Sequence, residues 1–145
     1  MKLSSPEFEN DERMPEKVGY TKENINPELH ISEIPEETVT LVLIMDDPDA
    51  MEPAGKIWDH WVQYDIEPTK TKIEEGENPG TSGVTDFRDT GYGGPNPPDG
   101  EHTYIFRIYA LDSELGLPKG ASKEDVENAM EEYIIEEAEL KGRYE

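Results

Sequence analysis

Three segments of the chain concentrate side chains that can exchange protons or bind ions. They are "DDPDA" (46–50), "WDHW" (58–61) and "GPNPPDGEHTY" (94–104). Each segment adjoins an expected strand: Asp47 follows one, whereas His60 and His102 each begin one. Loop residues held by strand ends are a usual way of building a site on a β scaffold. We therefore expect these three side chains to meet at one rim of a β-sheet fold.

Carboxylates beside imidazoles suit the binding of a small anion. Asp47 or Asp49 would accept a hydrogen bond from a histidine N–H, which fixes the tautomer and raises the imidazole pKa. A protonated histidine next to backbone N–H groups then attracts an anion. The simpler alternative stays open, because "DPDA" is also good turn chemistry and a single buried histidine is usually structural.

A metal site is a second alternative. Two imidazoles and one or two carboxylates, from Asp47, Asp49, His60 and His102, suit Zn²⁺ or Fe²⁺ and would permit hydrolysis or oxygen chemistry. No HxxxH, HxH or H-x-D spacing places two ligands on one element, and the chain has no cysteine. The glycine-rich segment lacks the Lys-Ser/Thr of a phosphate-binding P-loop, and no serine stands in a nucleophile-elbow setting.

The elements that would position these residues are mainly strands. "TVTLVLIM" (38–45) is continuously apolar, as in a strand buried on both faces. Residues 60–66 and 102–111 alternate with period two, which predicts two more strands, each with one inward face. The predicted inward faces hold His60, Val62, Tyr64 and Ile66 on the first strand, and His102, Tyr104, Phe106, Ile108 and Ala110 on the second.

Residues 67–101 form a long loop region, whose glycines and prolines favour order and function. Residues 122–141 predict a helix with Ser122 as N-cap and Gly142 as its stop. Several short strands, long connections and one late helix indicate an all-β fold. We expect a single domain over 1–145, a two-sheet antiparallel β-sandwich with a C-terminal helix.

The formal net charge of −22 limits the classes of partner. Without a basic stripe, nucleic-acid binding and docking to an anionic membrane are disfavoured. The excess of acidic residues suggests a halophilic, high-salt cell interior, where screening tolerates such self-repulsion. The lack of cysteine, of an apolar leader and of a long apolar run predicts a soluble cytoplasmic protein without integral membrane association.

With these segments in view, the chain resembles the phosphatidylethanolamine-binding protein family, in its short bacterial and archaeal, Raf kinase inhibitor-like branch. The similarity runs from "LSSPEF" and "NINPELHISEIP" through "DDPDA…WDHWVQYDI" and "TDFRDTGYGGPNPPDGEHTYIFRIYAL" to "AELKGRY". The resemblance implies Greek-key connections and a small pocket at one rim for phosphate-like anions and phospholipid headgroups, without a cofactor.

The resemblance also implies roles for single residues. Asp47, His60, His102 and Tyr104 match pocket residues, and Trp58 matches an aromatic at the mouth. Two further positions belong to the loops: Asp49 matches a second acid of the "DPDA" turn, and the backbone around Asn96 matches the stretch that faces the anion. We also expect Gly94 to let a ligand approach the backbone.

This sequence departs from the common pattern at three places. Met51-Glu52 precede the proline that often follows "DPDA" directly, Asn96 stands where many relatives have cysteine, and Thr103 replaces an arginine. We expect a non-enzymatic binding protein for an anionic or phosphorylated small ligand, with an altered preference. The alternatives are an inhibitor of a kinase or protease acting through the pocket rim, a metal-dependent enzyme and, for assembly, a homodimer.

Overall fold

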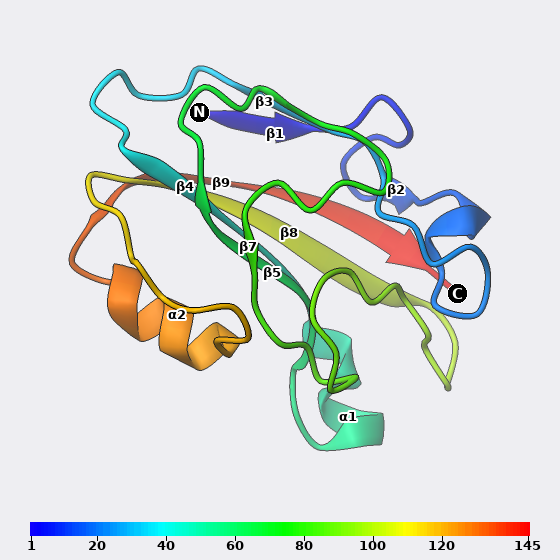
Figure 1. The fold of residues 1–145 in the computed structure, drawn as a ribbon. Coiled ribbons are helices and arrows are strands. Elements are labelled where there is room, and N and C mark those ends of the chain that lie inside the picture. Colours follow the sequence, from blue (N-terminus) through cyan, green and yellow to red (C-terminus); the bar gives the residue numbers. More distant parts are fainter.

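Two β-sheets and one eight-residue helix form three layers in the computed structural model, which describes residues 1–145. In Figure 1 the smaller sheet lies on one face of the larger sheet, and α2 lies on the opposite face. The smaller sheet has the order β1 (Lys2–Ser4), β3 (Leu29–Ser32), β6 (Lys72–Ile73). The larger has the order β2 (Glu12–Arg13), β9 (Ile134–Tyr144), β8 (His102–Leu111), β4 (Thr40–Asp47), β5 (Trp58–Ile66), β7 (Thr81–Ser82).

Strand β4 lies in the middle of the larger sheet and is buried along its whole length. It pairs antiparallel with β5 on one side and β8 on the other. A strand covered on both faces favours a continuous apolar run, and the run from Leu41 to Met45 is the pattern that predicted it. Phe106, Ile108 and Ala110 of β8 face the core between the sheets, while Val42 and Ile44 of β4 face the layer formed by α2.

The alternation predicted for residues 60–66 is wrong, because β5 contains two irregularities. In the pairing with β4, Met45 lies opposite Trp61 and Asp46 opposite Asp59, so His60 is an extra residue. A bulge of this kind lets two successive side chains turn to the same face. The second irregularity lies near Asp65, whose φ is 52°. As a result Val62 and Tyr64 pack on the α2 side, whereas Trp61 and Ile66 join the core between the sheets.

The helix predicted for residues 122–141 is also wrong beyond its first two turns. Helix α2 spans Lys123–Met130, and the Ser122 side chain caps it by accepting from the Asp125 N–H. The chain then turns, and β9 pairs antiparallel along the whole length of β8. Gly142 is no helix stop: it lies within β9, where a Cβ would come 2.5 Å from the Met14 side chain.

The two-sheet, mainly β architecture expected from the sequence is confirmed. One pairing differs from the expected antiparallel pattern, since β2 runs parallel to β9. The Greek-key connections, the single-domain assignment and the halophilic origin stay predictions.

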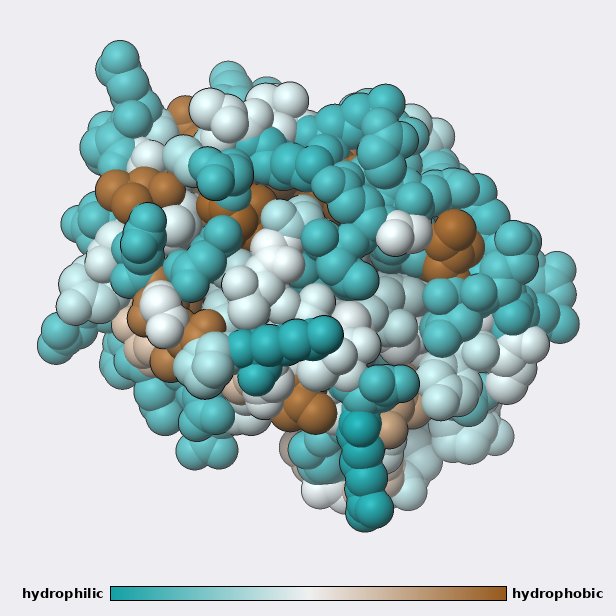
Figure 2. All heavy atoms as spheres, viewed as in Figure 1, coloured by the Kyte–Doolittle hydropathy of each residue, from teal (hydrophilic) through white to brown (hydrophobic).

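The surface is dominated by polar residues. Figure 2 shows hydrophilic residues over most of the visible face, with small separate apolar patches. None of the helices is long and apolar enough to cross a bilayer. The cavity described below lies at one end of this mainly hydrophilic molecule.

Candidate functional site

A cavity of about 190 Å³ opens at the end of the sandwich where β4 ends and where β5 and β8 begin. Its walls come from the turn after β4, from the first residues of β5 and β8, and from the glycine-proline loop, residues 91–100. Six of the eight residues expected from the sequence line it: Asp47, Trp58, His60, Asn96, His102 and Tyr104. Strand ends that are far apart in the sequence thus meet at one rim, as expected.

His102 is held between two carboxylates. Its Nδ1 lies 2.6 Å from Asp47 Oδ2, and its Nε2 lies 2.5 Å from Asp99 Oδ1. Burial lowers the pKa of the His102 imidazole, but the two carboxylates raise the pKa more, so it lies above its ordinary value of 6.5. A carboxylate oxygen only accepts hydrogen bonds, so both ring nitrogens donate when the ring is protonated. The site thus stabilises an imidazolium.

The "DPDA" segment is both a turn and part of the site. Asp47 Oδ1 accepts from the Asp49 N–H at 2.9 Å and caps the 3-10 helix Pro48–Ala50, while its Oδ2 binds His102. Asp49 lies outside the cavity lining, and its Oδ2 accepts from the Thr103 N–H at 2.8 Å. Asp49 therefore fastens this turn to the start of β8.

His60 has the opposite electrostatic character to His102. Its Nδ1 lies 2.6 Å from the Gly93 carbonyl, which can only accept, so Nδ1 carries the proton. Burial lowers the pKa of His60 below 6.5, with the Gly93 hydrogen bond opposing this shift in part. The ring is therefore neutral near pH 7 and presents Nε2 as a hydrogen-bond acceptor. The bulge in β5 turns this ring toward Tyr104, with ring centroids 5.2 Å apart.

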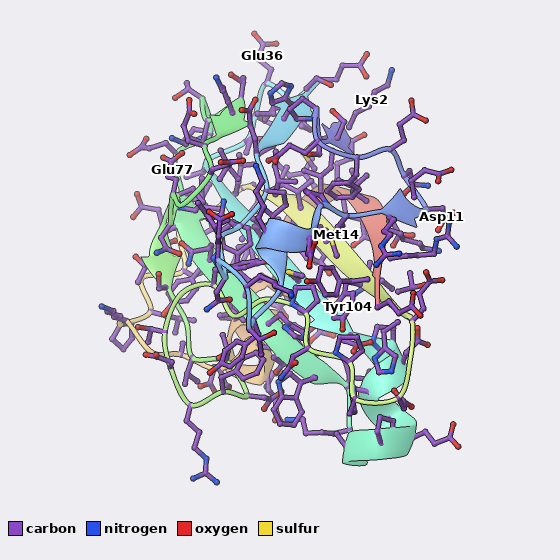
Figure 3. All side chains as sticks on the ribbon, turned by 90° about the vertical axis from the view of Figure 1, so that its right-hand side faces the viewer. Lys2, Asp11, Met14, Glu36, Glu77 and Tyr104 are labelled. Carbon is purple, nitrogen blue, oxygen red and sulfur yellow. The ribbon has the colours of Figure 1, made fainter.

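Tyr104 is a fully buried residue whose hydroxyl forms no hydrogen bond of good geometry, although the Asn96 backbone and the Asp47 carboxylate lie close to it. Figure 3 shows it in the interior among the strands, whereas Lys2 and Glu36 project outward. Burial raises the pKa of the Tyr104 phenol, and the nearby Asp47 charge adds to the shift, so the hydroxyl stays protonated. Buried hydroxyls nearly always have a partner. This hydroxyl lines the cavity and is available to donate to a bound group.

An aromatic wall borders the cavity and was not identified from the sequence. Phe87 lines the cavity and makes edge contacts with Trp58 and His60, at centroid distances of 5.8 and 5.4 Å. Tyr20, which is 40% exposed, stacks on Phe87 at 4.2 Å. Phe87 sits in the long loop, in the stretch beginning "TDFRDTGYGG" that carries part of the resemblance, but no periodicity marks it, so the three-dimensional fold reveals its role.

The structure places Gly94 outside the cavity, which corrects the expectation that its backbone is approached by a ligand. A Cβ on Gly94 would lie 2.0 Å from the Val18 carbonyl oxygen, and its N–H donates to the Asn24 side chain. Gly94 thus lets the glycine-proline loop pack against residues 18–24. Asn96 lines the cavity and is exposed at its edge.

The four side chains considered for a metal do not form a ligand set. His60 Nδ1 binds a backbone carbonyl, and Asp49 binds a backbone N–H. No group of three or more His, Cys, Asp or Glu side chains is arranged to hold a metal ion. The chemistry of the cavity is that of hydrogen-bond donors and acceptors: a tyrosine hydroxyl, a neutral imidazole and an imidazolium between carboxylates.

Comparison with known proteins gives consistent results. The family model for phosphatidylethanolamine-binding protein matches residues 4–145. A UPF0098 protein of Methanothermobacter thermautotrophicus is 44% identical over 151 residues, covering 99% of this chain and 98% of the relative. A crystal structure of a phosphatidylethanolamine-binding protein homologue, CT736 of Chlamydia trachomatis, superposes with a TM-score of 0.95 at 36% identity, covering 99% and 96% of the two chains. The structure of YbcL of E. coli, a member of the mammalian PEBP family, gives 0.90 at 27% identity, covering 99% and 97%.

Proposed function

Since this chain belongs to the phosphatidylethanolamine-binding protein family, in its bacterial and archaeal branch, we propose that it is a binding protein whose rim cavity takes a phosphoryl group. This phosphoryl group would belong to a lipid headgroup such as that of phosphatidylethanolamine, or to another phosphorylated molecule. The observation that carries the proposal is the buried Tyr104 hydroxyl, which lines the cavity without a partner. A phosphoryl oxygen can accept the hydrogen bond that this hydroxyl would donate.

Three side chains would contact the phosphoryl group. The Tyr104 hydroxyl and the Nε2–H of His102 would donate to its oxygens. The Nε2 of neutral His60 is an acceptor, so it would accept a hydrogen bond from the O–H of a monoprotonated phosphate or phosphate monoester. The buried Asp47 would hold His102 protonated and correctly turned. Asn96 and Trp58, at the wall and mouth, would contact the remainder of the ligand.

We propose binding rather than catalysis as the role of this cavity. Its lining contains no serine, threonine, lysine or cysteine that could act as a nucleophile. Both ring nitrogens of His102 are engaged by carboxylates, which suits charge stabilisation more than proton shuttling. A metal-dependent hydrolase has less support, because Asp47, Asp49, His60 and His102 are turned to different partners. We also propose that the protein is located in the cytoplasm.

A second candidate function is inhibition of a kinase or protease through the rim. Large apolar side chains are exposed in segments next to the cavity lining: Met51 is 52% exposed, Tyr20 40% and Ile57 36%. Apolar residues around a polar pocket suit contact with a protein surface. If the pocket takes part in that contact, saturating phosphate should release the partner enzyme and restore its activity.

Calorimetric titration tests the proposed function. Inorganic phosphate and phosphorylethanolamine should bind at millimolar concentration with one site per chain, whereas ethanolamine alone should give no heat of binding. Replacing His102 with Ala should abolish the binding of both phosphorylated compounds. Absence of binding by both compounds up to about 50 mM, beyond the 1 mM scale of weak complexes, would refute the proposal.

A further inference from the structure

Asp99 is an exposed residue that reaches into the site. Its carboxylate lies 2.5 Å from His102 Nε2, although its side chain is 48% exposed and that of His102 only 4%. Asp99 follows Pro98, which lines the cavity. The acidic group is therefore at the mouth, on the solvent side of the buried imidazole.

The hydrogen bond to His102 is the one side-chain contact that holds Asp99. No other hydrogen bond or ion pair involves its carboxylate. The following residue, Gly100, has φ 115° and open space around its Cα, and the stretch from Pro98 to Glu101 is exposed. A glycine in this region of conformational space adjusts its backbone more readily than other residues. The carboxylate can thus leave His102 without disturbing the core.

The position that Asp99 occupies is one that the proposed ligand needs. His102 gives its Nδ1–H to the buried Asp47, so Nε2–H is its remaining donor. A carboxylate and a phosphoryl oxygen both form charge-assisted hydrogen bonds to an imidazolium. Only one of them can take this N–H in good geometry.

We propose that Asp99 is a tethered carboxylate that takes the place of the ligand on His102 Nε2 and has to be displaced before a phosphoryl group binds. The inference rests on the proposed function of the cavity. It makes Asp99 a residue that sets affinity, because the apparent dissociation constant equals the intrinsic one divided by the fraction of molecules in which Asp99 has moved away. If that fraction is about one tenth, wild-type binding is about tenfold weaker than the cavity itself allows.

A titration with inorganic phosphate tests this competition, using Asp99→Asn and Asp99→Ala. The matched control is Asp112→Asn, which removes the same charge from an exposed aspartate beyond the other end of β8, where its side chain makes no hydrogen bond or ion pair. The assay is run at about pH 5.5, one unit below the ordinary histidine pKa, so that His102 stays protonated in every variant. Circular dichroism and the thermal midpoint verify that each variant is folded.

Both Asp99 variants should bind phosphate roughly fivefold to tenfold more tightly than the wild type. The Asp112 control should stay within about twofold, because screening at physiological salt extends only about 8 Å. The imidazole signals give a second readout: loss of the Asp99 partner should lower the pKa of His102 and leave His60 unchanged. A purely structural bond between Asp99 and His102 would instead loosen the loop and weaken phosphate binding.

Each outcome decides the matter. Tighter phosphate binding by both Asp99 variants than by a wild type that also binds phosphate supports the competition. Unchanged or weaker binding, while the wild type still binds phosphate, overturns the inference and leaves the proposed function standing. Absence of binding by the wild type and by both variants removes the proposed function together with the inference.

Discussion

Replacing Tyr104 with Phe should stabilise the free protein while weakening phosphate binding. The substitution removes a hydroxyl that is fully buried and has no partner, and leaves the ring in place. A buried group without a partner costs about 1–3 kcal/mol. Because water entering the cavity would offset part of that cost, we expect a gain of about 1 kcal/mol in the free energy of unfolding. For 145 residues the unfolding entropy is about 0.3 kcal/mol/K, so the melting temperature should rise by about 3 °C.

Tyr64 provides a matched control for the same substitution. It is equally buried, but its hydroxyl donates to the Pro118 carbonyl at 2.5 Å and accepts from the Ala121 N–H at 3.3 Å. Replacing Tyr64 with Phe leaves the buried Ala121 N–H and the part-buried Pro118 carbonyl without their partner, which should destabilise the protein by about 1–3 kcal/mol. The same chemical change is thus expected to have opposite signs at the two positions.

Urea denaturation at fixed pH measures both changes in stability, and calorimetry with phosphate measures the binding. Tyr104→Phe should weaken phosphate binding about tenfold, as expected for the loss of one good hydrogen bond to a charged group. Destabilisation by Tyr104→Phe as large as that by Tyr64→Phe would refute the reasoning. So would unchanged affinity for phosphate, because the hydroxyl would then have no role in binding.

Three other predictions concern the surroundings of the site. Lys123 lies 3.2 Å from Asp46 and 2.9 Å from Asp59, so Lys123→Met should destabilise the protein by about 2 kcal/mol in urea denaturation at pH 7. Burial raises the pKa of the Asp59 carboxyl above its ordinary value, so part of its charge is lost at pH 4 and the destabilisation should be smaller there. Gly94→Ala should lower stability by about 3 kcal/mol in the same assay, because its Cβ would collide with the Val18 carbonyl; a loss below 1 kcal/mol would contradict the packing. The raised pKa of His102 adds stability that is fully present below about pH 6.5 and is lost as pH rises through the folded pKa. The difference in stability between wild type and His102→Asn should therefore shrink from pH 6 to pH 9, and a difference that grows would be evidence against the paired imidazolium.

The strands that carry the site could be predicted from the sequence because each obeys a simple local pattern. The apolar run of β4 reflects the burial of both sheet faces, and the alternation of β8 reflects the burial of one face. A hydrogen bond from a histidine to Asp47 or Asp49 was predicted from a carboxylate after one strand and an imidazole at the start of another, and the structure identifies the pair as His102 and Asp47. Sequence and resemblance together therefore located six of the cavity residues.

The last strand could not be predicted in this way, because its residues favour a helix locally. Glutamate, alanine, leucine and lysine between residues 131 and 141 have good helix propensity, and periodicity alone therefore extends the helix of α2 through them. In the fold this segment is β9, and its long pairing with β8 overrides the local preference for a helix. Its inward side chains pack against the core: Ala138, Leu140 and Tyr144. The signal available in the sequence was the alternation of Leu140, Gly142 and Tyr144 with the charged Lys141 and Arg143.

The remaining details depend on contacts between distant segments. The bulge at His60 is set by its pairing with β4, and no residue type announces it. Phe87 and Asp99 reach the cavity from loops whose conformation the sequence pattern does not fix. Their contacts with Trp58 and His102 appear only when the fold is complete.

The most direct test of the phosphoryl-binding cavity is a phosphate titration of the wild-type protein, followed through the imidazole NMR signals of its three histidines. His60 and His102 line the cavity, whereas His30 lies on β3 of the smaller sheet and is paired with Glu28. We predict saturable shifts of His60 and His102 at millimolar phosphate, while His30 stays unchanged. Unshifted His60 and His102 signals, or equal shifts of all three histidines, would contradict the assignment of this cavity as the binding site.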